Sequence, residues 1–206
     1  MKERPILFSG AMVRAILDGR KSQTRRVIKD FAIKRLSNRH EFATSGPHQL
    51  SMKETPGYAY VELDSGALVG LPCPYGQPGD RLWVREAFAV QQALWEMNHG
   101  PQPVHYLADS PKEQIEDYTG KPSIHMPRWA SRITLEITGV RVERLQEISE
   151  ADALAEGTAP SIVGRAFDHM KYRAGFQTLW DSINAARGYG WEVNPWVWVI
   201  EFRRMS

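Results

Sequence analysis

Cysteine is almost absent from this 206-residue chain, in which Cys73 is the only one. A disulfide within the chain is therefore excluded, and a cysteine-based zinc site is not expected. A lone thiol suits the reducing cytoplasm. Cys73 lies between Pro72 and Pro74, with no helix start nearby that would activate its thiol, so we expect no catalytic role for it.

Long apolar runs are also absent. No stretch approaches the roughly 20 apolar residues that a membrane-spanning helix needs. The first five residues, Met1 to Pro5, lead into a short apolar segment without the pattern of a signal peptide. We therefore expect a soluble cytoplasmic protein without a membrane partner; the sequence does not indicate a protein partner.

Several cofactor patterns are missing as well. The chain has no glycine-rich phosphate loop of the Rossmann or P-loop type, and the alternation of strands and helices typical of a parallel sheet is absent. The six histidines are scattered, without a pair at metal-ligand spacing. We expect no resident cofactor and no protein metal site. If the chain is a nuclease, carboxylates and substrate phosphate would recruit a divalent cation such as Mg²⁺.

Charge is unevenly distributed although the formal net charge is only +2. The segment 19–40 carries one acid, Asp30. Its cations are Arg20, Lys21, Arg25, Arg26, Lys29, Lys34, Arg35 and Arg39. Such a segment either attracts phosphate or forms a solvated basic edge, and charge alone leaves both readings open.

Apolar periodicity predicts many short strands and few helices. The expected strands cover about 5–9, 24–28, 58–63, 67–69, 81–89, 105–106, 132–145 and 195–202. The expected helices cover about 11–18, 148–157 and 170–186. This order predicts an α+β fold: one domain over 1–206, built as a small mixed or antiparallel β-barrel with a few flanking helices. Polar, turn-rich stretches predict loop insertions at about 37–58 and 91–122.

One charged residue falls on an apolar face of an expected strand. Leu82, Val84 and Glu86 alternate and should point to the same side of strand 81–89. A carboxylate that points inward with two apolar side chains must be paired or functional. Glu86 is therefore a candidate site residue.

The segment after the first helix combines cations with hydroxyls. Its pattern, Gly-x-Lys-x-x-Thr-x-Arg at Gly19, Lys21, Thr24 and Arg26, resembles that of ASCH domains, which are relatives of the PUA-like RNA-binding barrels. Residues 79–86 are similar to the family's Gly-Asp-x-Leu-x-Val-x-Glu strand.

Two later segments extend the likeness. Residues 126–132 and 194–199 resemble the longer ASCH proteins of phages and prophages. The likeness covers most of the chain and is weakest over 37–58 and 91–122. It implies a compact barrel whose cleft accepts RNA or a modified nucleoside.

The resemblance also implies a chemistry. Some small ASCH members are amidohydrolases that act on N(4)-acetylcytidine, and others are described as ribonucleases. By analogy Thr24 would attack the acyl carbon, Lys21 would activate it and Glu86 would protonate the leaving amine. In the structural alternative, Lys21 and Glu86 form a buried ion pair and Thr24 bonds locally. This chain is about twice the length of those members, so its substrate stays open.

Other cations and one aromatic residue complete the expected binding set. Aromatic side chains beside arginines can stack on bases. The candidates for contacts with substrate or nucleic acid are Arg20, Arg25, Arg26, Arg85, Arg128 and Trp129. The sequence leaves three rivals to a hydrolase: a non-catalytic module that binds RNA or modified DNA, a metal-dependent ribonuclease, and a phage protein–protein adaptor.

Overall fold

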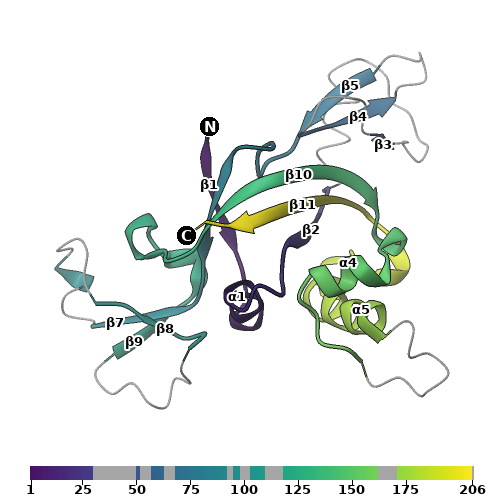
Figure 1. Cartoon of the computed structure of the whole chain (residues 1–206). Coiled ribbons are helices and arrows are strands. Elements are labelled where there is room, and N and C mark those ends of the chain that lie inside the picture. Colours follow the sequence, from purple (N-terminus) through teal and green to yellow (C-terminus); the bar gives the residue numbers. More distant parts are fainter. Residues whose placement is uncertain are drawn as a thin grey trace.

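A five-stranded mixed sheet forms the centre of the molecule in the computed structural model (Figure 1), which describes residues 1–29, 50–51, 57–62, 68–91, 95–97, 103–109, 118–161 and 171–205. The strand order is β1 (Glu3–Leu7), β6 (Arg81–Arg85), β10 (Thr134–Arg144), β11 (Trp196–Arg204) and β2 (Gln23–Val27). Strands β1 and β6 are parallel, whereas the other neighbours are antiparallel. The predicted mixture of α and β structure is confirmed, and closure of the sheet into a barrel stays a prediction.

Two smaller sheets lie on opposite sides of this centre. One has the order β3 (Leu50–Ser51), β4 (Tyr58–Glu62), β5 (Leu68–Pro72); the other has the order β8 (His105–Tyr106), β7 (Phe88–Gln91), β9 (Tyr118–Lys121). The predicted insertion at 37–58 falls largely outside the described residues, and about half of the one at 91–122 does. The extent of the domain therefore stays a prediction.

The single strand predicted over 81–89 is wrong. The chain changes sheet at Glu86 and Ala87, because β6 pairs with β1 and β10 whereas β7 pairs with β8 and β9. Side-chain alternation continues through this junction, with Val84, Glu86 and Phe88 all buried. A period of two therefore cannot reveal that the strand has changed its partners.

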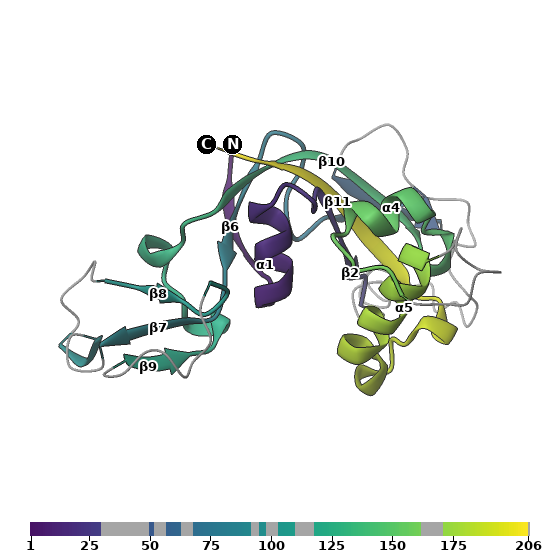
Figure 2. The same ribbon diagram turned by 60° about the horizontal axis from the view of Figure 1, so that its bottom comes forward.

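The expected helices are confirmed as α1 (Gly10–Leu17), α4 (Glu150–Ala155) and α5 (Lys171–Asn184). Short 3₁₀ turns accompany them: η2 (Ser123–His125), η3 (Arg128–Ala130), η4 (Leu145–Glu147), η6 (Ala185–Arg187) and η7 (Trp191–Val193). Strands β10 and β11 curve over α1, while α4 and α5 lie beyond the end of the curve (Figures 1 and 2). Within the described ranges, no helix is both long and apolar enough to cross a membrane.

Strand β11 separates two hydrophobic cores. Trp198, Ile200 and Phe202 belong to the core that contains α1 residues. Val197 and Val199 belong to the core formed with α4 and α5. Because both faces of the strand are covered, its sequence is a nearly continuous apolar run and not an alternation of apolar and polar residues.

The register of β11 with β2 distributes the candidate residues between these cores. Thr24 pairs with Ile200 and Arg26 with Trp198, whereas Arg25 pairs with Val199. Directly paired residues of neighbouring strands point to the same face of a sheet. Thr24 and Arg26 therefore face the α1 side, and Arg25 faces α4 and α5.

The end of α4 packs tightly against α1 at Gly157. This residue has a φ of +73°, and an added Cβ would lie 2.8 Å from the Ala15 Cβ and 2.9 Å from the Lys21 Cβ. A side chain would therefore be strained by the backbone and crowded by its neighbours. The absence of one lets the end of α4 approach Lys21.

We predict that Gly157→Ala destabilises the protein more than Gly188→Ala does. Gly188 also has a positive φ, +82°, but an added Cβ there would meet nothing within 4 Å. The left-handed backbone should cost either variant about 1–2 kcal/mol, and crowding should add about 1–3 kcal/mol at Gly157 alone. Urea unfolding monitored by circular dichroism measures the difference. Equal losses would show that the contact with Ala15 and Lys21 is not tight.

Candidate functional site

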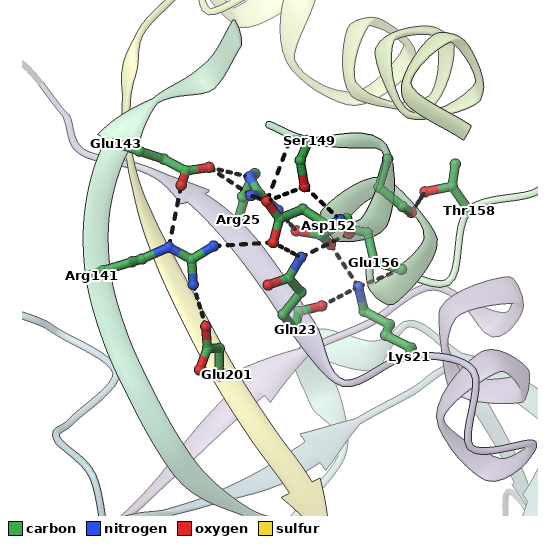
Figure 3. Close-up of polar contacts among 11 residues, drawn as sticks. Lys21, Gln23, Arg25, Arg141, Glu143, Ser149, Asp152, Glu156, Thr158 and Glu201 are labelled. Carbon is green, nitrogen blue, oxygen red and sulfur yellow. Dashed lines mark hydrogen bonds and ion pairs between the residues drawn. The ribbon is translucent and has the colours of Figure 1, made fainter. Parts of the chain in front are cut away.

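Lys21 lies in a buried cage formed by the end of α4 and the start of β2 (Figure 3). Its Nζ donates to the Gln23 carbonyl at 2.8 Å, to the Glu156 carbonyl at 2.7 Å and to Glu156 Oε2 at 2.8 Å. Only 5% of Lys21 and 4% of Glu156 is exposed. Burial lowers the pKa of Lys21, the Glu156 carboxylate opposes this shift, and the nearby Arg26 and Arg25 add to it.

Arg25 connects the Lys21 cage to β10 and α4 (Figure 3). Its guanidinium lies 2.6 Å from Glu143 Oε1, 3.1 Å from Glu156 Oε1 and 3.5 Å from Asp152 Oδ2. Carboxylates thus surround this buried cation. Arg25 therefore links β2 to β10 and α4 at this point, and its part in substrate binding stays a prediction.

Asp152 receives several stabilising contacts in the same network. Burial raises its pKa, but hydrogen bonds from Gln23 and Ser149 and the charge of Arg25 outweigh this and bring the pKa to about 2. The Asp152 carboxylate therefore stays ionised throughout the physiological range. Its charge helps to fix Gln23 and Arg25 on the α4 side of β2.

Thr24 and Arg26 lie on the opposite side of β2, with the ring of Phe8 close by. The Arg26 guanidinium lies 5.2 Å from the centroid of this ring, and Lys21 Nζ lies 5.5 Å from it. Arg26 donates to the Leu7 carbonyl at 2.7 Å, while its buried Nε has no hydrogen-bond partner. In the part of the chain that the structure describes, no carboxylate forms a salt bridge with Arg26.

Glu86 occupies a second ionic cluster at the junction of β6 and β7. Its carboxylate is 1% exposed and accepts hydrogen bonds from Arg132 Nε at 2.9 Å and Nη2 at 3.0 Å. Arg132 also binds Asp109 and lies 4.0 Å from the Tyr106 ring centroid. Burial raises the pKa of Glu86, while the hydrogen bonds and charge of Arg132 oppose the rise.

The structure does not pair Lys21 with Glu86. Lys21 binds Glu156 and Glu86 binds Arg132, so the buried Lys21–Glu86 ion pair that the sequence suggested as an alternative is wrong. Phe8 links the two regions: its ring lies near Lys21, and its backbone N–H donates to the Arg85 carbonyl, one residue before Glu86.

The remaining candidates lie at other places on the molecule. Arg20 is exposed and pairs with Asp18. Arg85 and Arg128 lie 5.4 and 5.9 Å from the ring centroid of Trp83, and Arg128 also pairs with Glu3. The neighbouring Trp129 is 39% exposed.

Sequence reasoning missed Glu156, Arg132 and Phe8. Glu156 looks like an ordinary residue near a helix end, because its partner is 135 positions away along the chain. Arg132 has a clearer signal: Thr134 pairs with Trp83 in antiparallel register, so Arg132 must lie near Arg85 and Glu86 once β6 and β10 are known to be neighbours. The sequence alone does not reveal this pairing.

The described residues do not form a ready-made metal site. Among the residues that the structure describes, no group of three or more histidine, cysteine, aspartate or glutamate side chains is arranged to hold an ion. The carboxylates of both ionic clusters are instead bound to arginine or lysine.

We predict that Arg132→Met leaves Glu86 buried without its partner. Removal of one member of a buried ion pair should lower the free energy of unfolding by about 3 kcal/mol at pH 7. The missing cation should raise the pKa of Glu86 further. A carboxyl group with a raised folded-state pKa loses stability as pH rises through that value, so the deficit should shrink between pH 7 and pH 5. Urea unfolding at each pH measures it.

Arg203→Met is the matched control for this prediction. It breaks an exposed pair with Glu136 and should cost at most about 1 kcal/mol, with little dependence on pH. The double variant Glu86→Gln/Arg132→Met should recover much of the stability lost by Arg132→Met. A deficit that is constant between pH 5 and pH 7 would contradict an unpaired Glu86 charge as its cause.

Comparison with known proteins gives one structural similarity. No protein-family model and no curated protein matches the chain. The chain is similar to a crystal structure described as the ASCH domain from Lactobacillus crispatus JV V101. The TM-score is 0.39 at 13% sequence identity, and the match covers 98% of this chain and 79% of that one. A TM-score this low carries no argument, so the resemblance to ASCH domains rests on the motifs at 19–26, 79–86, 126–132 and 194–199.

Proposed function

We propose that this chain is an ASCH-type domain that recognises RNA or a modified nucleoside beside β2 and hydrolyses an acyl-amide on the base. The observation that carries the proposal is Arg26, a cation on the α1 side of β2 with a buried, unpartnered Nε. A guanidinium in this state favours an acceptor supplied by a ligand, such as a carbonyl oxygen. An acylated cytosine carries such oxygens.

The groups around Arg26 suit acyl transfer. Thr24 is 4% exposed and shares the α1 side with Arg26, so its hydroxyl is the nucleophile in the proposal. The Lys21 cation lies near the same Phe8 ring as Arg26. A fixed positive charge favours the oxyanion that forms when a hydroxyl attacks a carbonyl carbon.

Glu86 is the acid in the proposed reaction. A carboxyl group acts as a general acid near neutral pH only when its pKa is raised, and burial raises that of Glu86. Arg132 fixes its orientation through two parallel hydrogen bonds. In the proposed reaction one substrate contacts both Glu86 and the Thr24 side of β2. Phe8 lies between these two regions.

The proposed reaction proceeds through an ester of Thr24. The Thr24 oxygen bonds to the acyl carbon and its proton passes to the Glu86 carboxylate, and the carbon–nitrogen bond breaks as Glu86 passes this proton on to the leaving amine. Water then cleaves the ester: its hydroxyl bonds to the acyl carbon and its proton passes through Glu86 to the Thr24 oxygen, which releases the carboxylic acid and leaves Glu86 as a carboxylate. The products are the free base amine and the acid.

We predict that Thr24→Val abolishes the hydrolysis of N(4)-acetylcytidine and that Glu86→Gln reduces kcat about 10²–10⁴-fold. Valine keeps the shape of threonine but has no hydroxyl, and glutamine cannot supply the proton. Chromatographic detection of cytidine measures turnover. Turnover by Thr24→Val would exclude the threonine ester, and none by the wild type would exclude this nucleoside as the substrate.

Two matched variants control for folding. Thr158→Val removes the hydroxyl of another buried threonine, which donates to the Ala153 carbonyl. Asp109→Asn alters the other carboxylate that binds Arg132. Both variants should retain turnover because neither residue acts on the substrate in the proposal. If Thr158→Val also loses turnover, the effect of Thr24→Val comes from disturbed packing and not from the missing nucleophile.

An RNA-binding surface on the outer face of β6 is favoured by a separate observation. Arg85 and Arg128 both lie over the ring of Trp83, and Trp129 is exposed next to Arg128. Exposed aromatic rings beside arginines can stack on single-stranded bases while the cations contact phosphate. In this proposal the surface holds the strand that carries the modified base.

We predict that Trp129→Ala weakens binding of a single-stranded oligoribonucleotide by about 5- to 100-fold, which corresponds to one lost base stack. Arg128→Ala should weaken binding and make it less dependent on salt. Fluorescence anisotropy at several salt concentrations measures both. Arg203→Ala removes an equal charge from an exposed site in β11 and is the control. An equal loss in Arg203→Ala would mean that only overall charge matters.

A further inference from the structure

Glu156 holds Lys21 through two hydrogen bonds and binds Arg25 through a third. Its Oε2 accepts from Lys21 Nζ at 2.8 Å, its main-chain oxygen accepts from the same Nζ at 2.7 Å, and its Oε1 binds Arg25 at 3.1 Å. The backbones of Lys21 and Glu156 also form an isolated β-bridge. Glu156 is thus fixed relative to Lys21 through both its main chain and its side chain.

The number of acceptors around Lys21 indicates its charge. Nζ has three acceptors at 2.7–2.8 Å, two on Glu156 and one on Gln23. An ammonium group has three N–H donors, whereas a neutral amine has only two. The cage is therefore fully satisfied only when Lys21 is protonated, and the short distances suit charge-assisted hydrogen bonds.

We propose that Glu156 is the positioning residue for Lys21, which it holds as a fixed ammonium cation at the edge of the Thr24–Arg26 side of β2. In this arrangement Lys21 stabilises developing negative charge and does not take the proton from Thr24. The part that Lys21 plays in hydrolysis rests on the proposed function. The protonation of Lys21 and its dependence on Glu156 are independent of the proposed function.

Glu156 is itself held by a larger network. Arg25 binds both Glu156 and Glu143, so the Glu156 carboxylate cannot turn away from Lys21 without breaking a second buried contact. Ser149 caps α4 through a reciprocal capping box with Asp152, and this fixes the helix whose C-cap is Glu156. The position of Lys21 therefore depends on β2, β10 and α4 together.

The charges that face Lys21 determine what loss of Glu156 would do. Arg25 and Arg26 of β2 are cations and, like burial, lower the pKa of Lys21; the carboxylate of Glu156 at the end of α4 raises it. Without that negative charge, the remaining effects all favour the neutral amine. Lys21 should then lose its proton at lower pH, and a site that requires the ammonium should lose activity earlier on the alkaline side.

The experiment compares Glu156→Gln with Glu143→Gln. Both variants remove a carboxylate from Arg25, but only Glu156 also accepts hydrogen bonds from Lys21, two in number. Nitrogen-15 NMR of labelled lysine shows whether Lys21 Nζ carries three protons, and a pH titration gives its pKa. Lys21→Arg identifies the resonance, since it removes that signal.

We expect the wild type and Glu143→Gln to show three protons on Lys21 Nζ at pH 7. In Glu156→Gln the pKa of Lys21 should fall by about 1–3 units. A neutral Lys21 in the wild type at pH 7, or equal shifts in the two variants, would overturn the proposal. If Glu156→Gln does not fold, the wild-type spectrum still decides the charge of Lys21. Glu156→Asp then tests whether a negative charge at position 156 is enough to keep Lys21 protonated.

Turnover provides the second readout. When kcat is plotted against pH, its alkaline limb should move to lower pH in Glu156→Gln, with little change in KM. In Glu143→Gln the alkaline limb should stay where it is in the wild type. Glu156→Asp keeps the negative charge and should restore the limb. If the wild type does not hydrolyse N(4)-acetylcytidine, the proposed function fails, while the NMR titration still confirms or overturns the positioning of Lys21.

Discussion

The buried contact between Arg25 and Glu156 is the interaction on which the rest of the arrangement depends. It connects the central sheet to α4, and through Glu156 it reaches Lys21 (Figure 3). A charge placed in this environment is costly unless hydrogen-bonded partners surround it. The α4 side of β2 surrounds Arg25 with Glu143, Asp152 and Glu156, so these charges depend on one another as a network and not as separate pairs.

Strand β2 consequently has two chemically different sides. On the side toward α4, Arg25 is surrounded by carboxylates that link β2 to β10 and α4. On the side toward α1, Arg26 has a carbonyl and an aromatic ring as neighbours and keeps a buried Nε without a partner. Two consecutive arginines with equal charge thus have different uses, because the alternation of a strand places them in different surroundings.

The sequence predicts this molecule well where local pattern is sufficient and poorly where distant segments meet. Helices α1, α4 and α5 follow from apolar spacing and from Ser149 and Gly157 at the ends of α4. The inward direction of Glu86 follows from its alternation with Leu82 and Val84. The partners of Lys21 and Glu86 do not follow, because Glu156 and Arg132 lie 135 and 46 positions away and only tertiary packing selects them.

The separation of Lys21 from Glu86 has a chemical consequence for a site of this kind. A direct Lys21–Glu86 pair would make the position of the cation depend on that of the carboxylate. Each group instead has its own counter-ion, Glu156 for the cation and Arg132 for the carboxylate, so neither must be released by the other before a substrate is bound. Lys21 is therefore positioned by the end of α4 and Glu86 by the chain that enters β10, so a change at one group need not displace the other.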